Sequence, residues 1–196
     1  MGSASTPRRP EIRVFAGPNG SGKSSLTLQQ YIIEPYINAD VLKKDRGYTD
    51  LEAAQHATSM REAAVAAAQS FTFETVLSTD RNIDLLRAAK AAGYFIRCIF
   101  VLTVDPQLNV GRVESRVQAG GHNVETEKII SRYDRSLARI PTLRKLCDRL
   151  NIYDNSLDAP YRIFKQRNSD FHIFPSILWP EEKIRQLVTT GTFDKG

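Results

Sequence analysis

The sequence has little cysteine and histidine and no long apolar run. Among its 196 residues are two cysteines and three histidines, and no Cys/His cluster has the spacing of a zinc site. Cys98 lies inside an apolar stretch, so we expect two reduced thiols and a cytoplasmic location rather than a disulfide. No stretch approaches the roughly 20 apolar residues of a membrane span. We therefore expect neither a disulfide scaffold, nor a zinc protein, nor a membrane partner.

The N-terminus lacks the apolar core of a secretory signal. Residues 1–10 are rich in small residues, proline and arginine, and we expect them to be a disordered lead-in. Residues 11–196, long enough for one good core, should form a single domain. The net charge of +5 admits an anionic partner. Nucleotide phosphates would suffice, so we expect no nucleic acid.

A complete phosphate-binding loop follows a short apolar strand predicted over residues 12–16 and precedes a helix that starts at Ser25. Its residues are Gly17, Pro18, Asn19, Gly20, Ser21, Gly22, Lys23 and Ser24. The glycines let backbone N–H groups turn around a phosphate, and the helix N-terminus adds its positive dipole end. Lys23 can reach the β- and γ-phosphates, and the Ser24 hydroxyl can ligate Mg²⁺. We predict that the chain binds ATP with Mg²⁺.

Strand and helix patterns alternate, which predicts an α/β fold: a P-loop NTPase-type parallel sheet flanked by helices. The predicted strands are 12–16, 36–40, 71–75, 94–102, 152–153 and 161–164. The predicted helices are 51–70, 80–92 with Asp80 as cap, 106–119, 124–140, a further helix reaching Leu150, and 180–188. The stretch 94–102 is the most apolar, so we expect it at the sheet centre.

Ligands of open parallel sheets bind beyond the carboxyl ends of the strands. Asn38 and Asp40 end the second predicted strand. Asp40 is our candidate for the base that deprotonates an attacking hydroxyl in phosphoryl transfer. From position alone, a helix N-cap fits Asp40 equally well.

The third predicted strand ends in a polar segment that includes Glu74, Thr75 and Ser78, which we assign to the substrate side. Glu74 has two functional interpretations, an outer-sphere carboxylate for Mg²⁺ or a ligand to substrate hydroxyls. The alternative is a structural partner for a nearby arginine. Asp105, which precedes Pro106, is better explained as a helix cap than as the strand-end acid of a motor ATPase.

Basic residues mark two later helices joined by Gly120-Gly121-His122, which together predict an arginine-bearing helical lid over about residues 112–140. Their spacings of three and four place them on shared helix faces: Arg112 and Arg116, then Lys128, Arg132, Arg135 and Arg139. Arginine suits such a lid because its planar fork binds phosphate in bidentate fashion. A solvated basic face is the plainer alternative. We interpret His122 as a hinge or hydrogen-bonding residue rather than a metal ligand.

Taken in order, these motifs resemble the zeta-toxin family, in a short stand-alone form, over about residues 11–157. The segments that carry the resemblance are 17–25, 37–40, 73–78, 112–124, 132–137 and 153–156. The resemblance implies a P-loop kinase that transfers the ATP γ-phosphate to a sugar hydroxyl of UDP-N-acetylglucosamine or a related UDP-sugar. It also implies a toxin whose product poisons cell-wall precursor synthesis and a separate antitoxin protein that restrains it.

Carried onto this chain, the resemblance makes Asp40 the catalytic base and Arg116 a lid arginine. Arg112, Arg132 and Arg135 compete for the place of the second lid arginine. The chain is shorter than the best-known zeta toxins, and Gly-Gly-His replaces a longer lid segment, which leaves the acceptor open. Two other functions compete: a kinase of another acceptor (a nucleotide, an antibiotic or a nucleic-acid end) and a nucleotide-dependent regulatory ATPase.

Overall fold

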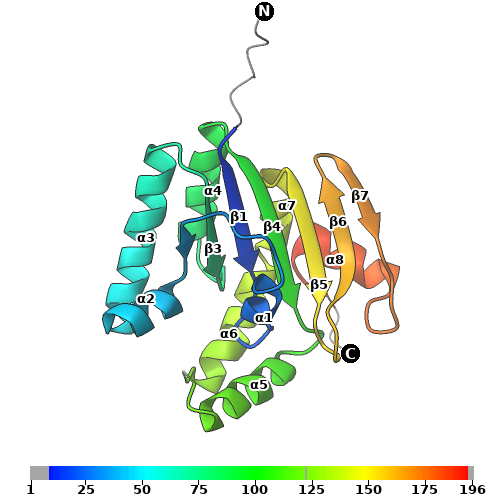
Figure 1. Cartoon of the computed structure of the whole chain (residues 1–196). Coiled ribbons are helices and arrows are strands. Elements are labelled where there is room, and N and C mark those ends of the chain that lie inside the picture. Colours follow the sequence, from blue (N-terminus) through cyan, green and yellow to red (C-terminus); the bar gives the residue numbers. More distant parts are fainter. Residues whose placement is uncertain (1–8, 122, 194–196) are drawn as a thin grey trace, which may run out of the picture.

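In the computed structural model, which describes residues 9–121 and 123–193, a seven-stranded sheet runs through the molecule in the order β2-β3-β1-β4-β5-β6-β7 (Figure 1). The strands are β1 (Glu11–Ala16), β2 (Tyr36–Ile37), β3 (Phe71–Thr75), β4 (Phe95–Leu102), β5 (Arg149–Asp154), β6 (Tyr161–Arg167) and β7 (Asp170–Ile173). The first five are parallel, and β6 and β7 extend the sheet as antiparallel strands. The predicted α/β fold is confirmed, with this hairpin as an addition.

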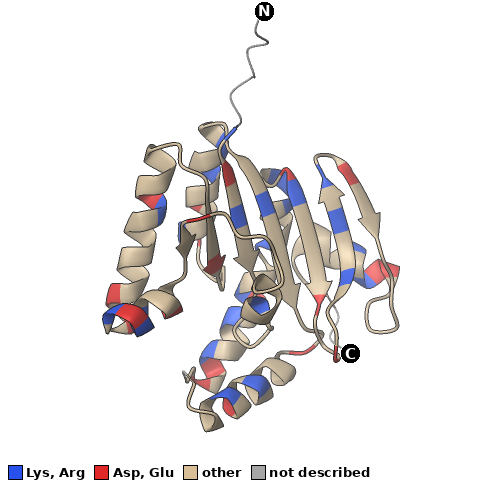
Figure 2. Cartoon of the chain, in the orientation of Figure 1, with Lys and Arg blue, Asp and Glu red and all other residues tan. Residues whose placement is uncertain are grey.

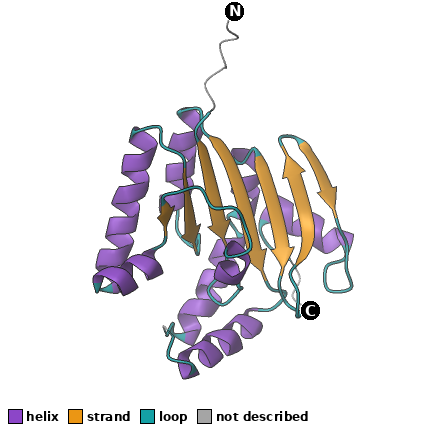
Figure 3. Cartoon of the chain, in the orientation of Figure 1, coloured by secondary structure: helices purple, strands orange, loops and turns teal. Residues whose placement is uncertain are grey.

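Helices lie mainly behind the sheet and beyond the carboxyl ends of the parallel strands (Figure 3). They are α1 (Lys23–Thr27), α2 (Ala39–Arg46), α3 (Asp50–Ala66), α4 (Arg81–Ala91), α5 (Pro106–Gln118), α6 (Thr126–Leu137), α7 (Ile140–Leu146) and α8 (Glu181–Thr190). In Figure 1, α4, α7 and α8 cover the rear face, whereas α5 and α6 project below the strand ends. The front face carries α1 and the segment that follows it.

The core explains why β4 is central. Ile96, Cys98 and Phe100 alternate along it and are fully buried in the main cluster behind the sheet. On the front face, Ile99 and Val101 belong to a smaller cluster that α1 and the segment after it cover. A strand buried on both faces needs a continuous apolar run, which β4 has from Cys98 to Leu102. The predicted central position is confirmed.

Several local predictions are wrong. The helix expected to reach Leu150 ends at Leu146, because Cys147 is extended and Leu150 is buried in the sheet opposite Cys98. The strand β7 had no clear signal, since its residues are mostly exposed at the sheet edge. Asp80 stands at the N-cap position of α4, but its side chain makes no capping hydrogen bond.

Arg9 and Pro10, which we expected in the disordered lead-in, are ordered. Arg9 donates hydrogen bonds to the carbonyls of Gly93 and Tyr94, and the Pro10 carbonyl accepts one from the Phe95 backbone, so both residues are part of the fold. Residues 1–8 lie outside the described residues. Cys98 and Cys147 are buried free thiols, as predicted. Within residues 9–121 and 123–193, no helix combines the length and the apolarity that crossing a bilayer requires.

Candidate active site

The phosphate-binding loop lies between the ends of β1 and β4, where the chain order of the sheet reverses. All three of its glycines approach other backbone or side-chain atoms closely, as Gly17 and Gly22 illustrate. A Cβ on Gly17 (φ +140°) would stand 1.9 Å from the Val101 carbonyl oxygen. A Cβ on Gly22 (φ +89°) would stand 2.2 Å from Nδ2 of Asn155, which donates a hydrogen bond to the Ser21 carbonyl. These positions exclude any side chain, so the packing itself requires glycine.

Lys23 begins α1, and its Nζ donates a 2.8 Å hydrogen bond to the Pro18 carbonyl. Burial lowers its pKa from 10.5 to about 8, with the Arg116 charge in the same direction. Glu74 and Asp40 raise the pKa again. The four charged groups therefore act on one another, although they come from four different segments of the chain.

Glu74 is held by hydroxyl groups. Its two carboxylate oxygens accept from the Ser24 hydroxyl (2.9 Å) and the Tyr36 hydroxyl (2.7 Å). Tyr36 in turn accepts from Nδ2 of Asn38 (2.9 Å), and burial raises the pKa of the Tyr36 phenol. A hydroxyl beside a carboxylate is an oxygen-only donor set of the kind that holds Mg²⁺ together with substrate phosphates.

Asp40 lies in the first turn of α2 and does not cap it. The cap is Asn38, whose Oδ1 accepts from the Asp40 backbone N–H (2.9 Å). The capping alternative for Asp40 is therefore wrong. Its carboxylate accepts no hydrogen bond from the residues that the structure describes, so it is available to a ligand.

A cavity of about 840 Å³ joins these groups. It collects most of the predicted site residues, namely Asn19, Gly20, Gly22, Lys23, Ser24, Ser25, Asn38, Asp40, Glu74, Thr75, Ser78, Arg112, Arg116 and Arg132. Gly17, Pro18 and Ser21 form the loop behind the lining, and Ser21 is fully buried. Thr75 forms hydrogen bonds with backbone groups of the site. Its Oγ1 accepts from the Leu77 N–H, and its carbonyl accepts from the Gly17 N–H.

The predicted lid corresponds to α5 and α6, which share a small apolar cluster formed by Val110, Val113 and Ile129. The C-terminal half of α6 belongs to the main core, where the Tyr133 hydroxyl donates to the Thr103 carbonyl (2.5 Å). The Ser136 hydroxyl likewise donates to the Val76 carbonyl (2.7 Å). The part that projects is therefore shorter than the predicted 112–140.

The arginines of the predicted lid differ in their contacts. Arg112 donates weakly to the Ser156 carbonyl (3.5 Å), and its buried Nη1 has no hydrogen-bond partner among the described residues. Arg135 is not brought to the cavity, because its guanidinium turns back to the Ser131 carbonyl and hydroxyl. The predicted single stripe is wrong for Arg139, which lies after α6 and pairs with Asp80 (3.1 Å). His122 lies outside the described residues.

Sequence reasoning missed Arg61, which lines the same cavity from α3. Only 6% of Arg61 is exposed; its guanidinium lies over the Phe73 ring (5.2 Å), and its Nε has no hydrogen-bond partner among the described residues. Burial, together with the Arg81 charge, lowers its pKa to about 10. A signal was available: Arg61 stands at helical spacing from Ala53 and Ala57 on the buried face of α3.

Comparison with known proteins decides the family. The family model described as Zeta toxin matches residues 29–168. The chain belongs to the zeta toxin family. The match begins after the phosphate-binding loop, so the family assignment and the loop geometry are independent observations.

Relatives of this zeta-toxin family member share its fold at low identity. A Haemophilus influenzae protein described as "Uncharacterized protein" is 26% identical over 125 residues, which cover 61% of this chain and 89% of that protein. A chain from the crystal structure of AvrRxo1-ORF1:-ORF2 with ATP superposes with a TM-score of 0.71 at 12% identity, over 96% of this chain and 66% of that chain. This chain thus spans just under two thirds of that protein.

A chain from the PezAT chromosomal toxin-antitoxin system of Streptococcus pneumoniae superposes with a TM-score of 0.57 at 16% identity. The match covers 84% of this chain and 74% of that chain. At such identities the two structural matches show the fold alone. That fold is the mostly parallel sheet with flanking helices of P-loop kinase toxins.

Proposed function

We propose that this chain is an ATP-dependent kinase that transfers the γ-phosphate to a sugar hydroxyl of a UDP-sugar such as UDP-N-acetylglucosamine. One observation carries the proposal: Lys23, Asp40 and the lid arginines line a single cavity. Phosphoryl transfer needs a phosphate cradle, a base for the acceptor hydroxyl and cations for the developing charge. Those three requirements correspond to these residues.

The donor side consists of the phosphate-binding loop and the Ser24–Glu74 pair. With ATP bound, Lys23 would exchange its hydrogen bond to Pro18 for the β- and γ-phosphates. Ser24 and Glu74 would hold Mg²⁺, directly or through water, and the ion would neutralise charge on the phosphates. The second cavity, about 380 Å³ and lined by Ser25, Leu26 and Gln29 among others, opens beside the same loop.

In the transfer step, Asp40 accepts the proton of the acceptor hydroxyl. The hydroxyl oxygen forms a bond to the γ-phosphorus, and the bond from that phosphorus to the β–γ bridging oxygen breaks, which leaves ADP. Arg116, with Arg112 or Arg132, stabilises the charge on the transferred group. The unpartnered Nη1 of Arg112 supports its availability for such a contact.

Arg61 supports an acceptor that carries phosphate groups. Arg61 is only 6% exposed, and its guanidinium forms no ion pair with an acid in the described parts of the chain, which is costly unless a ligand neutralises the charge. It lines the cavity from α3, and Arg81 of α4 is close enough to act on its charge. A UDP-sugar has a diphosphate beside its sugar, which is the anion that two arginines would bind.

Toxicity, a separate antitoxin partner and a cytoplasmic location complete this proposal. The structurally similar PezAT chain comes from a toxin-antitoxin system. ATP is available in the cytoplasm, and the two free thiols suit that compartment.

The direct test incubates the protein with Mg·ATP and a panel of UDP-sugars, followed by mass spectrometry. We expect a UDP-sugar to gain one phosphoryl group. If no UDP-sugar gains it while another nucleotide, an antibiotic or an oligonucleotide end does, the chain is a kinase of a different acceptor. If ATP is hydrolysed and no acceptor is modified, the regulatory-ATPase alternative holds.

Two variants of acidic residues on α2 test the role of Asp40. Asp40→Asn should lower the transfer rate by about 10²–10⁴-fold while ATP binding survives. Asp45→Asn, an exposed acid on the same helix, should behave as the wild type. Equal activity of the two variants would remove Asp40 from the mechanism.

A further inference from the structure

The front face of the sheet carries a group of charged residues that the proposed catalysis does not use. Apart from α1 and the segment after it, this face carries no helix in the described part of the chain (Figures 1 and 3). The cavity lies at the carboxyl ends of the strands, whereas the uncovered area lies toward the amino ends of the parallel strands. Figure 2 shows basic residues crossing β1, β4, β5 and β6 on this sheet.

Four arginines stand in register across these four strands. Arg13 pairs with Arg97, Arg97 with Arg149, and Arg149 with Arg167, so all four point to one face. We call them the arginine row. Adjacent strands are about 4.8 Å apart, so the row is about 14 Å long. Like charges directly opposite each other destabilise a sheet, and three such pairs occur in succession here.

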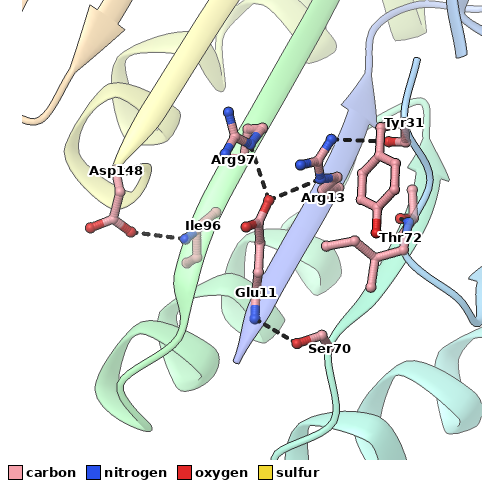
Figure 4. A network of polar contacts seen from close by, with 9 residues as sticks. Glu11, Arg13, Tyr31, Ser70, Thr72, Ile96, Arg97 and Asp148 are labelled. Carbon is pink, nitrogen blue, oxygen red and sulfur yellow. Dashed lines mark hydrogen bonds and ion pairs between the residues drawn. The ribbon is translucent and has the colours of Figure 1, made fainter. Parts of the chain in front are cut away.

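The row has little acid to balance it. Figure 4 shows Glu11 between Arg13 and Arg97, and one oxygen of its carboxylate pairs with both Nε atoms (2.9 and 3.0 Å). Neither Arg149 nor Arg167 has an ion pair with an acid among residues 9–121 and 123–193, although Asp170 of β7 stands opposite Arg167 in the register of the sheet. The Nε of Arg149 is buried without a hydrogen-bond partner among the same residues. Burial, with Arg97 and Arg167 on either side, lowers the pKa of Arg149.

We propose that the arginine row is a docking surface for an acidic segment of a separate protein. Carboxylates suit it because each planar guanidinium binds a carboxylate in bidentate fashion. Glu11 and Asp170 are two acids beside four arginines, so docking would add the carboxylates that are still missing and relieve the repulsion between neighbouring arginines. The surface is separate from the cavity, so the proposal does not depend on the proposed kinase activity.

Other occupants fit less well. A second copy of this chain would place one arginine row against another, and its net charge of +5 adds to the repulsion. Single-stranded nucleic acid needs free aromatic faces for base stacking. Here Arg13 lies over the Tyr31 ring (4.7 Å), and Arg97 and Arg149 lie near the Phe95 ring (5.6 and 5.9 Å). Guanidinium groups therefore already occupy faces of these rings that bases would need for stacking.

The test measures the binding of a fluorescein-labelled 16-residue peptide rich in glutamate, by anisotropy at low salt, to the full chain. A glutamine-substituted peptide and an oligouridylate of the same length serve as alternative probes. The variant is Arg149→Gln combined with Arg167→Gln. The matched control is Arg185→Gln with Arg87→Gln, which removes two exposed cations from helices of the opposite face.

We expect the glutamate peptide to bind the wild type and the control variant, and the row variant to bind at least tenfold more weakly. The free row variant should also melt about 2–4 °C higher than the wild type, because repulsion is removed. Binding of a fluorescent ATP analogue reports that the fold is intact. The proposal is overturned if the glutamate peptide does not bind, if both variants lose it equally, or if oligouridylate binds more tightly with the same dependence on Arg149.

Discussion

Lys23 and Arg61 are cations whose burial in the cavity destabilises their charged forms. The pKa of each is lowered mainly by burial, which shows that the charged form is less stable in the cavity than in water. Lys23 is partly compensated by Glu74 and Asp40, whereas Arg61 has only a weak contribution from Glu62. A bound anion would stabilise the charged form of both residues. The free energy that is lost when these charges are buried in the free protein is therefore recovered when an anion binds.

The pH dependence of ATP binding follows from Lys23. Its pKa in the free protein is about 8, and phosphate contacts would raise the pKa toward the ordinary 10.5. Between these values the complex holds more protons than the free protein, so binding takes up a proton. The association constant should fall by up to about tenfold per pH unit from pH 8 to 10. Calorimetry at pH 9 in buffers of different ionisation enthalpy measures the uptake.

The variant Lys23→Arg is the control for that titration, because arginine stays protonated throughout this pH range. It should bind ATP without taking up the proton. Equal wild-type affinity at pH 7 and pH 9.5 would contradict the role given to Lys23.

Arg61 should affect the acceptor rather than ATP. With Arg61→Met we expect the KM for the acceptor to rise at least tenfold and the affinity for ATP to stay the same. The melting temperature should not fall, since replacing a buried unpaired charge with an apolar side chain is neutral or stabilising. Steady-state kinetics and thermal melts check this. Arg87→Met, at an exposed arginine of α4, should leave both values unchanged; an unchanged acceptor KM in Arg61→Met would refute the role.

At the scale of the helices, the position of the lid arginine Arg116 depends on how the end of α5 packs. Arg116 stands in the last turn of α5, and the backbone N–H of Gly121 donates to its carbonyl (2.9 Å). The Arg116 side chain passes close to Gly121, where a Cβ would meet its Cγ at 2.6 Å. The conformation of this arginine therefore depends on the absence of a side chain at position 121.

A pair of glycine substitutions tests this packing. Gly121→Ala should displace Arg116 and lower kcat by about tenfold or more, in line with the cost of losing a charge-stabilising donor. Affinity for ATP should change little. Gly111→Ala, also on α5, meets nothing within 4 Å and should raise stability by up to about 1 kcal/mol without affecting kcat. If kcat is equal in the two variants, Arg116 does not act through its present position.

The elements that sequence patterns located best are those whose signal is local. The loop at Gly17–Ser24 and the strand β4 need only their own residues to be recognised. The strand β5 was predicted too short because its partner β4 is distant in the sequence, and β7 was missed because it is a short, mostly exposed strand at the sheet edge. Arg135 and Arg61 show the same limit for side chains. Helical spacing predicts which face of a helix a residue lies on, but only the tertiary packing determines what that face contacts.

At the scale of the whole molecule, one apolar cluster connects the sheet to the helices behind it. Leu150 of β5 is fully buried in this cluster. Leu150→Ala should lower the free energy of unfolding by about 2–5 kcal/mol, because the cavity left behind cannot collapse fully. Leu51→Ala, at a position 68% exposed, should change it by about 0.5 kcal/mol or less. Urea unfolding at matched pH measures both, and equal midpoints would contradict the place given to β5 in the core.

The sequence by itself determined the donor half of the site, since a phosphate-binding loop is a continuous segment whose backbone chemistry is local. It also determined Asp40 as a candidate base, because strand ends converge in any parallel sheet. Only the tertiary structure decided that Asn38 caps α2, that Arg61 lies in the cavity, and that four arginines from distant segments form one row. These are relations between residues far apart in the chain, which the sheet order and its register create.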